Sequence, residues 1–338
     1  MNRNLILMCL VLLAAVMATA GELPREEGAW HALAPMPTPR HDLEAVVWGA
    51  KIFAISGAGE STVRTVEVFD PKTGKWEASA PIPEERGWFG AAVIDGKLYC
   101  VGGKRVRSDE EKKQTGDDSH YEFRASLNIY DFGAGTWAFG PPLCGPRTGL
   151  KAVACGGKLY AIAGNGQKEG VRVEVFNPRI NEWSFGVPLP EGRCAPGVAV
   201  VQDKIYVFGG YGKGGERSET YIYNTKLGEW TEGAPMPTNR RDLASVTMGT
   251  KIYCVAGVSN GKYTAAVEVY DTEKDSWAIA PPLPLAKAWV GACEMSGRLY
   301  VMGGANYDDE KKAYLWRNEM DVYVPVPERR TASGGVEP

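Results

Sequence analysis

The chain has 338 residues, with 38 Lys and Arg against 41 Asp and Glu, which gives a net charge of −3 and an isoelectric point near 5.8. This balance argues against a nucleic-acid-binding surface, which usually carries a strong excess of basic residues. The length exceeds that of a typical single domain, so the chain contains either two domains or a repeat architecture.

The first twenty residues differ from the rest of the chain. Arg3 precedes an apolar run from Leu5 to Met17, and Ala18-Thr19-Ala20 has the small-residue pattern that a signal peptidase accepts. This run is too short to cross a bilayer, which needs about 20 residues. We therefore expect residues 1–20 to be a signal peptide, with a retained membrane anchor as the alternative. The mature protein then begins near Gly21, is secreted or periplasmic, and is not inserted in a membrane.

A sequence unit repeats along the remaining chain. Each unit carries one tryptophan, followed by a proline-rich turn and then by a short apolar segment that ends on glycine, such as KLYCVGG or KIYVFGG. The tryptophans are separated by 46 or 47 residues, apart from one interval of 61. The six recurring tryptophans are Trp30, Trp76, Trp137, Trp183, Trp230 and Trp277.

The repeat predicts β-strands. Its β-branched and aromatic runs, bounded by Gly, Pro, Asp and Asn, are typical of strands and tight turns. Four strands in each unit at this period indicate propeller blades, and the lack of a sustained helical period excludes a helical solenoid. Trp30 begins a fourth strand with no first three before it, while 319–325 is a third strand with no fourth after it. We expect these two to pair and close the ring, which removes two exposed sheet edges.

The glycine doublet, the aromatic-Asp pair and the spaced tryptophan resemble the kelch repeat, over residues 30 to about 325. The resemblance implies an all-β protein, a six-bladed β-propeller of four-stranded kelch blades. We expect the propeller to occupy residues 21–327, followed by a disordered tail at 328–338. Exported bacterial sialic-acid (N-acetylneuraminate) epimerases, or mutarotases, share this architecture, so the resemblance also admits a sugar isomerase.

Cysteine and histidine usage favours neither a disulfide framework nor a metal site. No two of His31, His41 and His120 have the spacing of metal ligands, and no cofactor fingerprint is present. Cys144 and Cys194 lie in turns of neighbouring blades, and whether they pair stays open. The cysteines predicted to be buried thiols are Cys100, Cys155, Cys254 and Cys293.

One cation recurs in each blade, eleven residues before the second strand. This register has two interpretations: an electropositive rim that attracts anions, or side chains that tie each turn to backbone carbonyl groups. The cations are Arg40, Arg86, Arg147, Arg193, Arg240 and Lys287.

Departures from the repeat point to one face of the propeller. Loops from the second to the third strand share a side with the connections between blades. These loops carry two insertions, Lys104 to Arg124 and Ala305 to Lys312. Long loops on a rigid frame commonly carry binding residues. Blades six, one and two are consecutive in the closed ring, so we expect a site where their loops converge.

The candidate site residues are polar and aromatic side chains on these loops. A histidine with two carboxylates suits acid–base catalysis, and the catalytic candidates are His41, Asp42 and Glu44. Tryptophan faces suit sugar rings, and cations suit carboxylate or sulfate groups. The candidate ligand-binding residues are Arg40, His41, Asp42, Trp88, Arg147, Lys151, Arg193, Arg240, Arg241, Asp242, Trp289 and Trp316.

Three functions from different classes follow. We favour a non-enzymatic recognition propeller for a carbohydrate, peptide or protein ligand. The alternative is a small-sugar isomerase or mutarotase, and the third is an assembly role for the outer blade surfaces. A deep pocket with perturbed pKa values favours an enzyme, a shallow face favours a binding module, and an apolar outer patch favours assembly. The sequence leaves the ligand and the oligomeric state undetermined.

Overall fold

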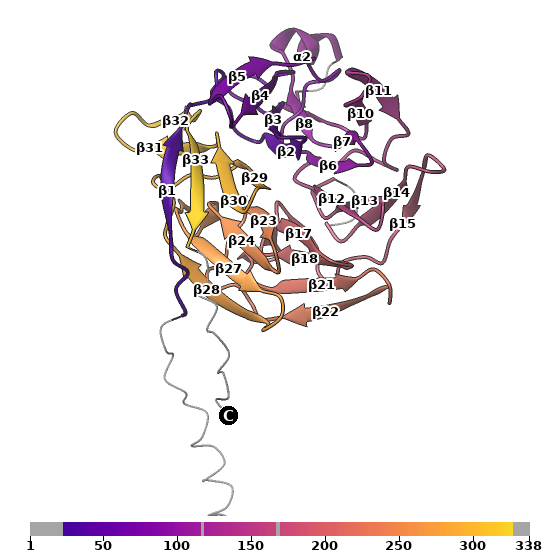
Figure 1. The fold of residues 1–338 in the computed structure, drawn as a ribbon. Coiled ribbons are helices and arrows are strands. Elements are labelled where there is room, and N and C mark those ends of the chain that lie inside the picture. Colours follow the sequence, from indigo (N-terminus) through magenta and orange to yellow (C-terminus); the bar gives the residue numbers. More distant parts are fainter. Residues whose placement is uncertain (1–22, 116–117, 167–169, 327–338) are drawn as a thin grey trace, which may run out of the picture.

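The computed structural model describes residues 23–115, 118–166 and 170–326. The chain forms four-stranded antiparallel sheets arranged around a central channel, as Figure 1 shows face-on. The expected signal peptide and tail lie outside the described residues. Across the described ranges, no helix has the length and hydropathy that a membrane crossing needs.

Six four-stranded sheets form the blades, and the strands of each blade are named in order from the channel outward. Blades 1 to 3 consist of β2 (Glu44–Trp48), β3 (Lys51–Ile55), β4 (Val66–Asp70) and β5 (Lys75–Ala78); β6 (Gly90–Ile94), β7 (Lys97–Val101), β10 (Leu127–Asp131) and β11 (Thr136–Gly140); and β12 (Lys151–Cys155), β13 (Lys158–Ile162), β14 (Val173–Asn177) and β15 (Glu182–Phe185). Blades 4 to 6 consist of β17 (Gly197–Val201), β18 (Lys204–Phe208), β21 (Thr220–Asn224) and β22 (Glu229–Gly233); β23 (Ala244–Met248), β24 (Lys251–Val255), β27 (Val267–Asp271) and β28 (Ser276–Ala280); and β29 (Gly291–Met295), β30 (Arg298–Met302), β33 (Met320–Pro325) and β1 (Gly28–Leu33).

The N-terminal strand completes the last blade, as the sequence predicts. β1 pairs antiparallel with β33, and Trp30 lies opposite Tyr323 in that ladder. The channel strands of neighbouring blades contact one another around the ring, including β29 of blade 6 with β2 of blade 1. The described residues therefore form one closed six-bladed propeller, which Figure 1 shows with β1 beside β33.

The recurring tryptophans join each blade to the one before it. The indole N–H of Trp76 in blade 1 donates to the carbonyl of Ala34 at 2.9 Å, and that of Trp30 in blade 6 donates to Pro281 at 2.9 Å. The four other blades repeat this bond at 2.8 to 3.1 Å. Apolar side chains fill the space between blades, so the core lies between neighbouring sheets rather than within one. The recurring tryptophans are therefore part of the scaffold.

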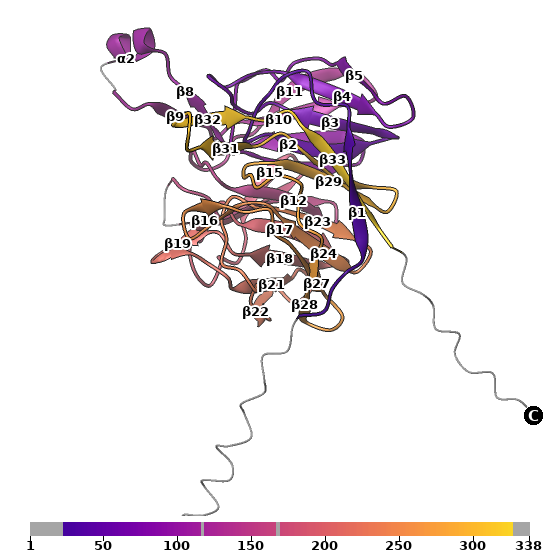
Figure 2. The same ribbon diagram turned by 90° about the vertical axis from the view of Figure 1, so that its left-hand side faces the viewer.

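Several short hairpins project from one side of the propeller. Figure 2 shows them on the left, with α2 farthest from the blades. The hairpins belong to loops between the second and third strands, and one of them also pairs with a short strand from the connection between blades 3 and 4. Both kinds of loop therefore lie on one face, as the sequence predicts. The elements are β8 (Lys104–Val106), α2 (Asp109–Thr115) and β9 (Tyr121–Phe123); β16 (Arg193–Cys194), β19 (Tyr211–Gly212) and β20 (Gly215–Glu216); β25 (Val258–Ser259) and β26 (Lys262–Tyr263); and β31 (Ala305–Asp308) and β32 (Ala313–Trp316).

The cysteines of the described ranges are free thiols. Cys144 is exposed and Cys194 is partly buried, and they do not form a disulfide. The four thiols predicted to be buried are buried in the structure: Cys100, Cys155, Cys254 and Cys293.

Candidate functional site

The recurring cations lie inside the propeller. Arg240 is fully buried, and its guanidinium donates to the carbonyl groups of Ala256, Ala266 and Cys254 and to the carboxylate of Glu268. Burial lowers the pKa of Arg147 to about 10, against the opposing effect of the Glu174 carboxylate. All six cations are at most 2% exposed: Arg40, Arg86, Arg147, Arg193, Arg240 and Lys287.

Because the six recurring cations are buried, they do not form the electropositive, ligand-binding rim that was one interpretation of the sequence. The guanidinium groups satisfy carbonyl groups of neighbouring strands and turns, because a buried carbonyl without a partner is costly. At most 2% exposed, these residues present almost no surface to a ligand on the loop face. We therefore assign to the scaffold the four that the sequence placed among the ligand-binding candidates: Arg40, Arg147, Arg193 and Arg240.

Two residues after each cation, the backbone turns into the left-handed region. The six residues at this position, here called the throat ring, have φ between 51° and 64°. Such a φ is uncommon outside glycine and unusual for a side chain as large as tryptophan. In blade 3 the position holds glycine, where a Cβ would meet the sulfur of Cys194 at 2.4 Å. The throat ring consists of Asp42, Trp88, Gly149, Ala195, Asp242 and Trp289.

Backbone hydrogen bonds connect the throat ring into a closed circle. Each residue donates its N–H to the carbonyl of the ring residue in the preceding blade, at 2.7 to 3.3 Å, and Asp42 donates to Trp289 to complete it. The circle accounts for the left-handed backbone, since that conformation lets each N–H reach the preceding blade. The six side chains are thereby held at the mouth of the channel.

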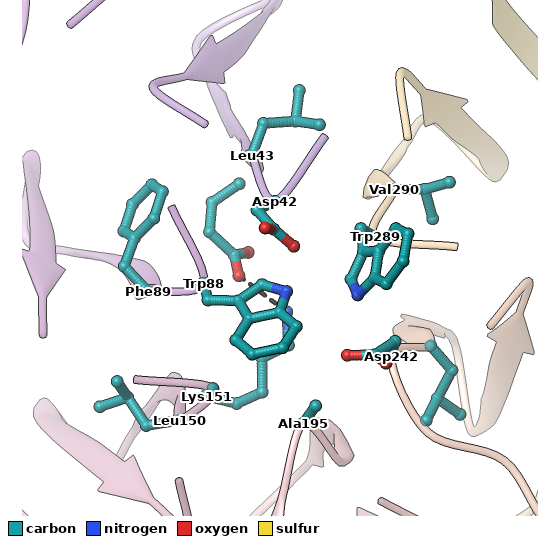
Figure 3. Close-up of a pocket in the computed structure, with 13 residues that line it drawn as sticks. Asp42, Leu43, Trp88, Phe89, Leu150, Lys151, Ala195, Asp242, Trp289 and Val290 are labelled. Carbon is teal, nitrogen blue, oxygen red and sulfur yellow. Dashed lines mark hydrogen bonds and ion pairs between the residues drawn. The ribbon is translucent and has the colours of Figure 1, made fainter. Parts of the chain in front are cut away.

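A narrow throat of about 30 Å³ lies at this mouth. Figure 3 shows the carboxylates of Asp42 and Asp242 and the indoles of Trp88 and Trp289 around the axis, with both indole nitrogens turned toward it. Among the described residues, Oδ1 of each carboxylate and Nε1 of each indole are buried without a hydrogen-bond partner. Buried polar atoms are rarely left unpaired in native proteins, so these four mark a place for a polar group.

Each throat carboxylate is held by the basic residue before it. Oδ2 of Asp42 lies 3.0 Å from Nδ1 of His41, and Oδ2 of Asp242 contacts Nη1 of Arg241. Burial raises the pKa of Asp242 to about 6; Arg241 opposes this rise, and the charge of Asp42 adds to it. Trp289 also lowers this pKa, although its N–H makes no hydrogen bond of normal geometry. A carboxyl that titrates near neutral pH therefore faces the throat.

Above the throat the loops enclose a vestibule, a cavity of about 380 Å³. Four rings form one wall: the ring of His41 stacks on Trp316 at 4.7 Å, Trp316 stacks on Tyr314 at 5.8 Å, and Trp289 adjoins His41 at 5.6 Å. The vestibule shares Asp42, Trp88 and Trp289 with the throat, so the two cavities adjoin.

The other wall of the vestibule comes from blade 2. Nζ of Lys104 lies 3.8 Å from the ring centroid of Trp88 and 3.9 Å from that of Tyr121, so the ammonium group lies between two aromatic faces. Burial lowers the pKa of Lys104, and the charges of Asp42 and Asp242 act in the opposite direction. The vestibule thus combines aromatic surfaces with one partly buried cation and carboxylates.

The remaining candidates lie at the edges of the two cavities. Glu44 lines the throat but not the vestibule, and its carboxylate pairs across the channel with Nζ of Lys151 at 2.8 Å. Arg241 lines neither cavity and reaches the site through Asp242. The structure brings together His41, Asp42, Trp88, Trp289 and Trp316, and whether they bind a ligand stays a prediction.

Sequence reasoning missed several residues of the vestibule. They come from the loops between the second and third strands of blades 1, 2 and 6, which differ from blade to blade and therefore have no common register that would show where these residues lie. Within the described ranges, no group of three or more His, Cys, Asp or Glu side chains is arranged to hold a metal ion. The missed residues that line the vestibule include Glu60, Thr62, Lys104, His120, Tyr121 and Tyr314.

Comparison with known proteins agrees with this architecture. A family model described as the KLHDC2/KLHL20/DRC7 Kelch-repeats domain matches residues 149–325, more than half of the chain. The chain belongs to the kelch-repeat family. A second family model, the Kelch motif, matches residues 39–83 in the first blade of this kelch propeller.

Curated relatives match over part of their length. Kelch-like protein 26 of Danio rerio is 27% identical over 188 residues, which are 54% of this chain and 29% of the relative. Kelch-like protein 35 of Mus musculus is 38% identical over 89 residues, which are 25% of this chain and 15% of the relative. The matched parts span less than a third of these relatives.

A solved structure titled "Structure of YjhT" matches with a TM-score of 0.70, over 88% of this chain and 98% of that chain. Its sequence identity is 15%, so the likeness shows the fold alone.

Proposed function

We propose that this kelch propeller is a binding protein that recognises a carbohydrate in the vestibule and throat. One observation carries the proposal: a vestibule of about 380 Å³ has aromatic rings on its walls and carboxylates at its floor. Aromatic faces bind the C–H faces of sugar rings, and carboxylate oxygens accept hydrogen bonds from sugar hydroxyl groups. The volume lies within the range of small-molecule sites.

The arrangement supports a small ligand more than a broad protein surface. Trp88 and Trp289 are partly buried at the boundary of the two cavities, rather than exposed on a flat face. A protein or peptide partner remains the alternative within the same class, because the outer rim of the vestibule exposes Tyr121 and Tyr314. We further propose that the ligand is met outside the cytoplasm, on the basis of the signal-peptide pattern at residues 1–20.

Thermal unfolding against neutral, acidic and sulfated sugars tests this proposal. A sugar present at 100 times its dissociation constant stabilises a protein by about 2.7 kcal/mol, which raises the unfolding midpoint by several degrees. We expect Trp316→Ala to abolish the shift, because it removes the ring that stacks on His41. Trp48→Ala is the matched control, because Trp48 stacks on Phe132 and lines neither cavity.

A shift that persists in Trp316→Ala would place the sugar elsewhere. No shift with any sugar would overturn the carbohydrate proposal and favour a peptide or protein partner. Such a partner would be sought by its effect on the fluorescence of the vestibule tryptophans.

A sugar isomerase or mutarotase is the second candidate, and the titration of Asp242 favours it. A carboxyl with a pKa of about 6, beside a histidine–carboxylate contact, can exchange protons near neutral pH. Exchange between the anomers of a bound sugar, followed by NMR, tests this activity. Asp242→Asn is expected to slow the exchange at a sugar concentration that saturates the variant, and an unchanged exchange rate would exclude Asp242 as the proton carrier.

A further inference from the structure

The throat offers a defined set of hydrogen bonds to whatever enters it. Its free groups are two donors, Nε1 of Trp88 and Nε1 of Trp289, and two acceptors, Oδ1 of Asp42 and Oδ1 of Asp242. Both aspartates are more than nine-tenths buried. The other oxygen of each lies against a nitrogen of His41 or Arg241 in the same loop, and the free oxygens remain for a ligand.

The donor and acceptor set restricts the chemistry of that ligand. A ligand carboxylate would face two aspartates and suffer like-charge repulsion. An ammonium group could donate to the carboxylates but could not accept from the indoles. An apolar group would leave all four atoms unpaired. Hydroxyl groups both donate and accept, so a group with one or two hydroxyls satisfies indoles and carboxylates together.

The dimensions of the throat restrict the size of the group. A cavity needs a volume of roughly 10–15 Å³ to hold one water molecule. A throat of about 30 Å³ therefore admits a group of about two heavy atoms. The ion pair between Glu44 and Lys151 also lines the throat. Gly149 and Ala195 occupy two adjacent ring positions, where their small size leaves room beside the tryptophans.

We propose that the throat is a subsite for the hydroxymethyl arm of an uncharged ligand, whose ring lies in the vestibule. The subsite rests on the proposed carbohydrate-binding function and deepens it by naming the group that enters the channel. Asp42 and Asp242 accept from the hydroxyl protons, and the indoles of Trp88 and Trp289 donate to the hydroxyl oxygens.

Matched sugars test the size and chemistry of the arm. D-Glucose and D-xylose differ only in the hydroxymethyl group, as do D-galactose and L-arabinose. We expect one hexose to bind at least tenfold more tightly than its matched pentose. The readout is the indole N–H signals in ¹⁵N-tryptophan-labelled protein, assigned through Trp88→Phe and Trp289→Phe. The hexose should shift the Trp88 and Trp289 signals, and the signal of Trp48 should stay in place.

A blocked throat tests the location. Ala195→Trp places an indole at a ring position where two other blades already carry tryptophan with the same left-handed backbone. We expect the variant to fold with an unfolding midpoint near that of the parent, and to reduce the hexose-to-pentose affinity ratio to about one. Asp42→Asn with Asp242→Asn serves as the second variant, and should lower hexose affinity while keeping the volume of the throat.

Ethylene glycol, which consists of two joined hydroxymethyl groups, distinguishes failure of the subsite from failure of the proposed function. If it shifts the Trp88 and Trp289 signals while no sugar binds, the subsite stands and the carbohydrate proposal fails. If hexose and pentose bind equally and those two signals stay in place, sugar binding stands and the subsite is overturned. If neither the diol nor any sugar shifts an indole signal, both are overturned.

Discussion

The backbone N–H of Asp42 donates to the carbonyl oxygen of Trp289 at 2.9 Å, across the junction between the first and last blades. This bond completes the circle that fixes the throat ring. The positions of the two side chains are thus determined by the main chain, independently of which side chains occupy them. Side chains at these positions can therefore be exchanged without altering the frame, which makes them suitable for setting ligand specificity.

Asp242→Asn is expected to stabilise the protein above pH 6. Burial raises the pKa of Asp242 from 3.8 to about 6, so the folded protein holds this proton more tightly than the unfolded chain does. The stabilising effect of protonation is fully present below about pH 3.8 and is lost as the pH rises through 6. Removing the charge should raise the free energy of unfolding at pH 7.5 by about 1–3 kcal/mol. Chemical denaturation at several pH values measures this.

The difference in the free energy of unfolding between Asp242→Asn and the parent protein should shrink steadily as the pH falls from 6 to 4. Asp131→Asn is the control, and its effect on stability should have the opposite sign. The reason is that the backbone N–H of Ala134 lowers the pKa of Asp131, which lies on an exposed turn. The Asp131 contribution is present at neutral pH and is lost in acid. A gain for Asp242→Asn that does not depend on pH would contradict our account of the throat.

Arg240→Met is expected to destabilise the fold strongly. The substitution leaves three carbonyl groups and the buried carboxylate of Glu268 without their cation. Removal of one member of a buried ion pair typically costs about 3–5 kcal/mol. Arg179→Met, at an exposed position, should change stability by less than about 0.5 kcal/mol. Urea denaturation of both variants compares them, and equal losses would argue against a scaffold role for the recurring cations.

Lys287→Arg is expected to raise stability. Lys287 is the one lysine in the cation register; its Nζ lies 3.8 Å from Asp321 and has no hydrogen-bond partner among the described residues. An arginine there could donate to the carbonyl groups that its counterparts use in other blades, and one charged hydrogen bond adds about 1.5–3 kcal/mol. An increase of at least 1 kcal/mol, estimated roughly from that range, should appear in thermal unfolding. A decrease would indicate that the larger side chain does not fit.

Thiol reagents should label Cys144 first in the folded protein. Cys144 is exposed, whereas burial raises the pKa of Cys194 to about 11 and keeps its thiol protonated. Cys144→Ser should remove the fast phase of labelling by a chromogenic disulfide reagent. Because the described cysteines are unpaired, a reducing agent should leave the unfolding midpoint unchanged. A lower midpoint after reduction would reveal a disulfide in solution.

The repeat made most of the fold predictable from the sequence. Six copies of one pattern identified the strands, and the unmatched strand at each end predicted the pairing of β1 with β33. The helix α2 was not foreseen, since the insertion that contains it occurs in one blade only.

The site was less predictable than the fold. The alignment of the repeats showed that Trp88 and Trp289 occupy equivalent positions. It did not show that Asp42 and Asp242 share their backbone conformation, because residues of different types give no sign of it. A left-handed φ at tryptophan or alanine is not visible in a sequence, because the residues that commonly adopt it are glycine, asparagine and aspartate. The burial of the recurring cations was also not apparent from the sequence. A residue that recurs at the same position of each repeat can be either buried or exposed on a rim.

The pairing of β1 with β33 has a consequence for how the protein is made. Leu33 and Met320 lie opposite each other in that ladder although roughly 290 residues separate them. At a ribosomal speed of about 5–20 residues per second, the first strand waits roughly 15–60 s for its partner. Until then blade 6 cannot be completed, and the free edge of β33 can accept the β1 of another molecule in place of its own. The newly made chain is therefore most open to exchanging strands with a neighbour just before it is finished.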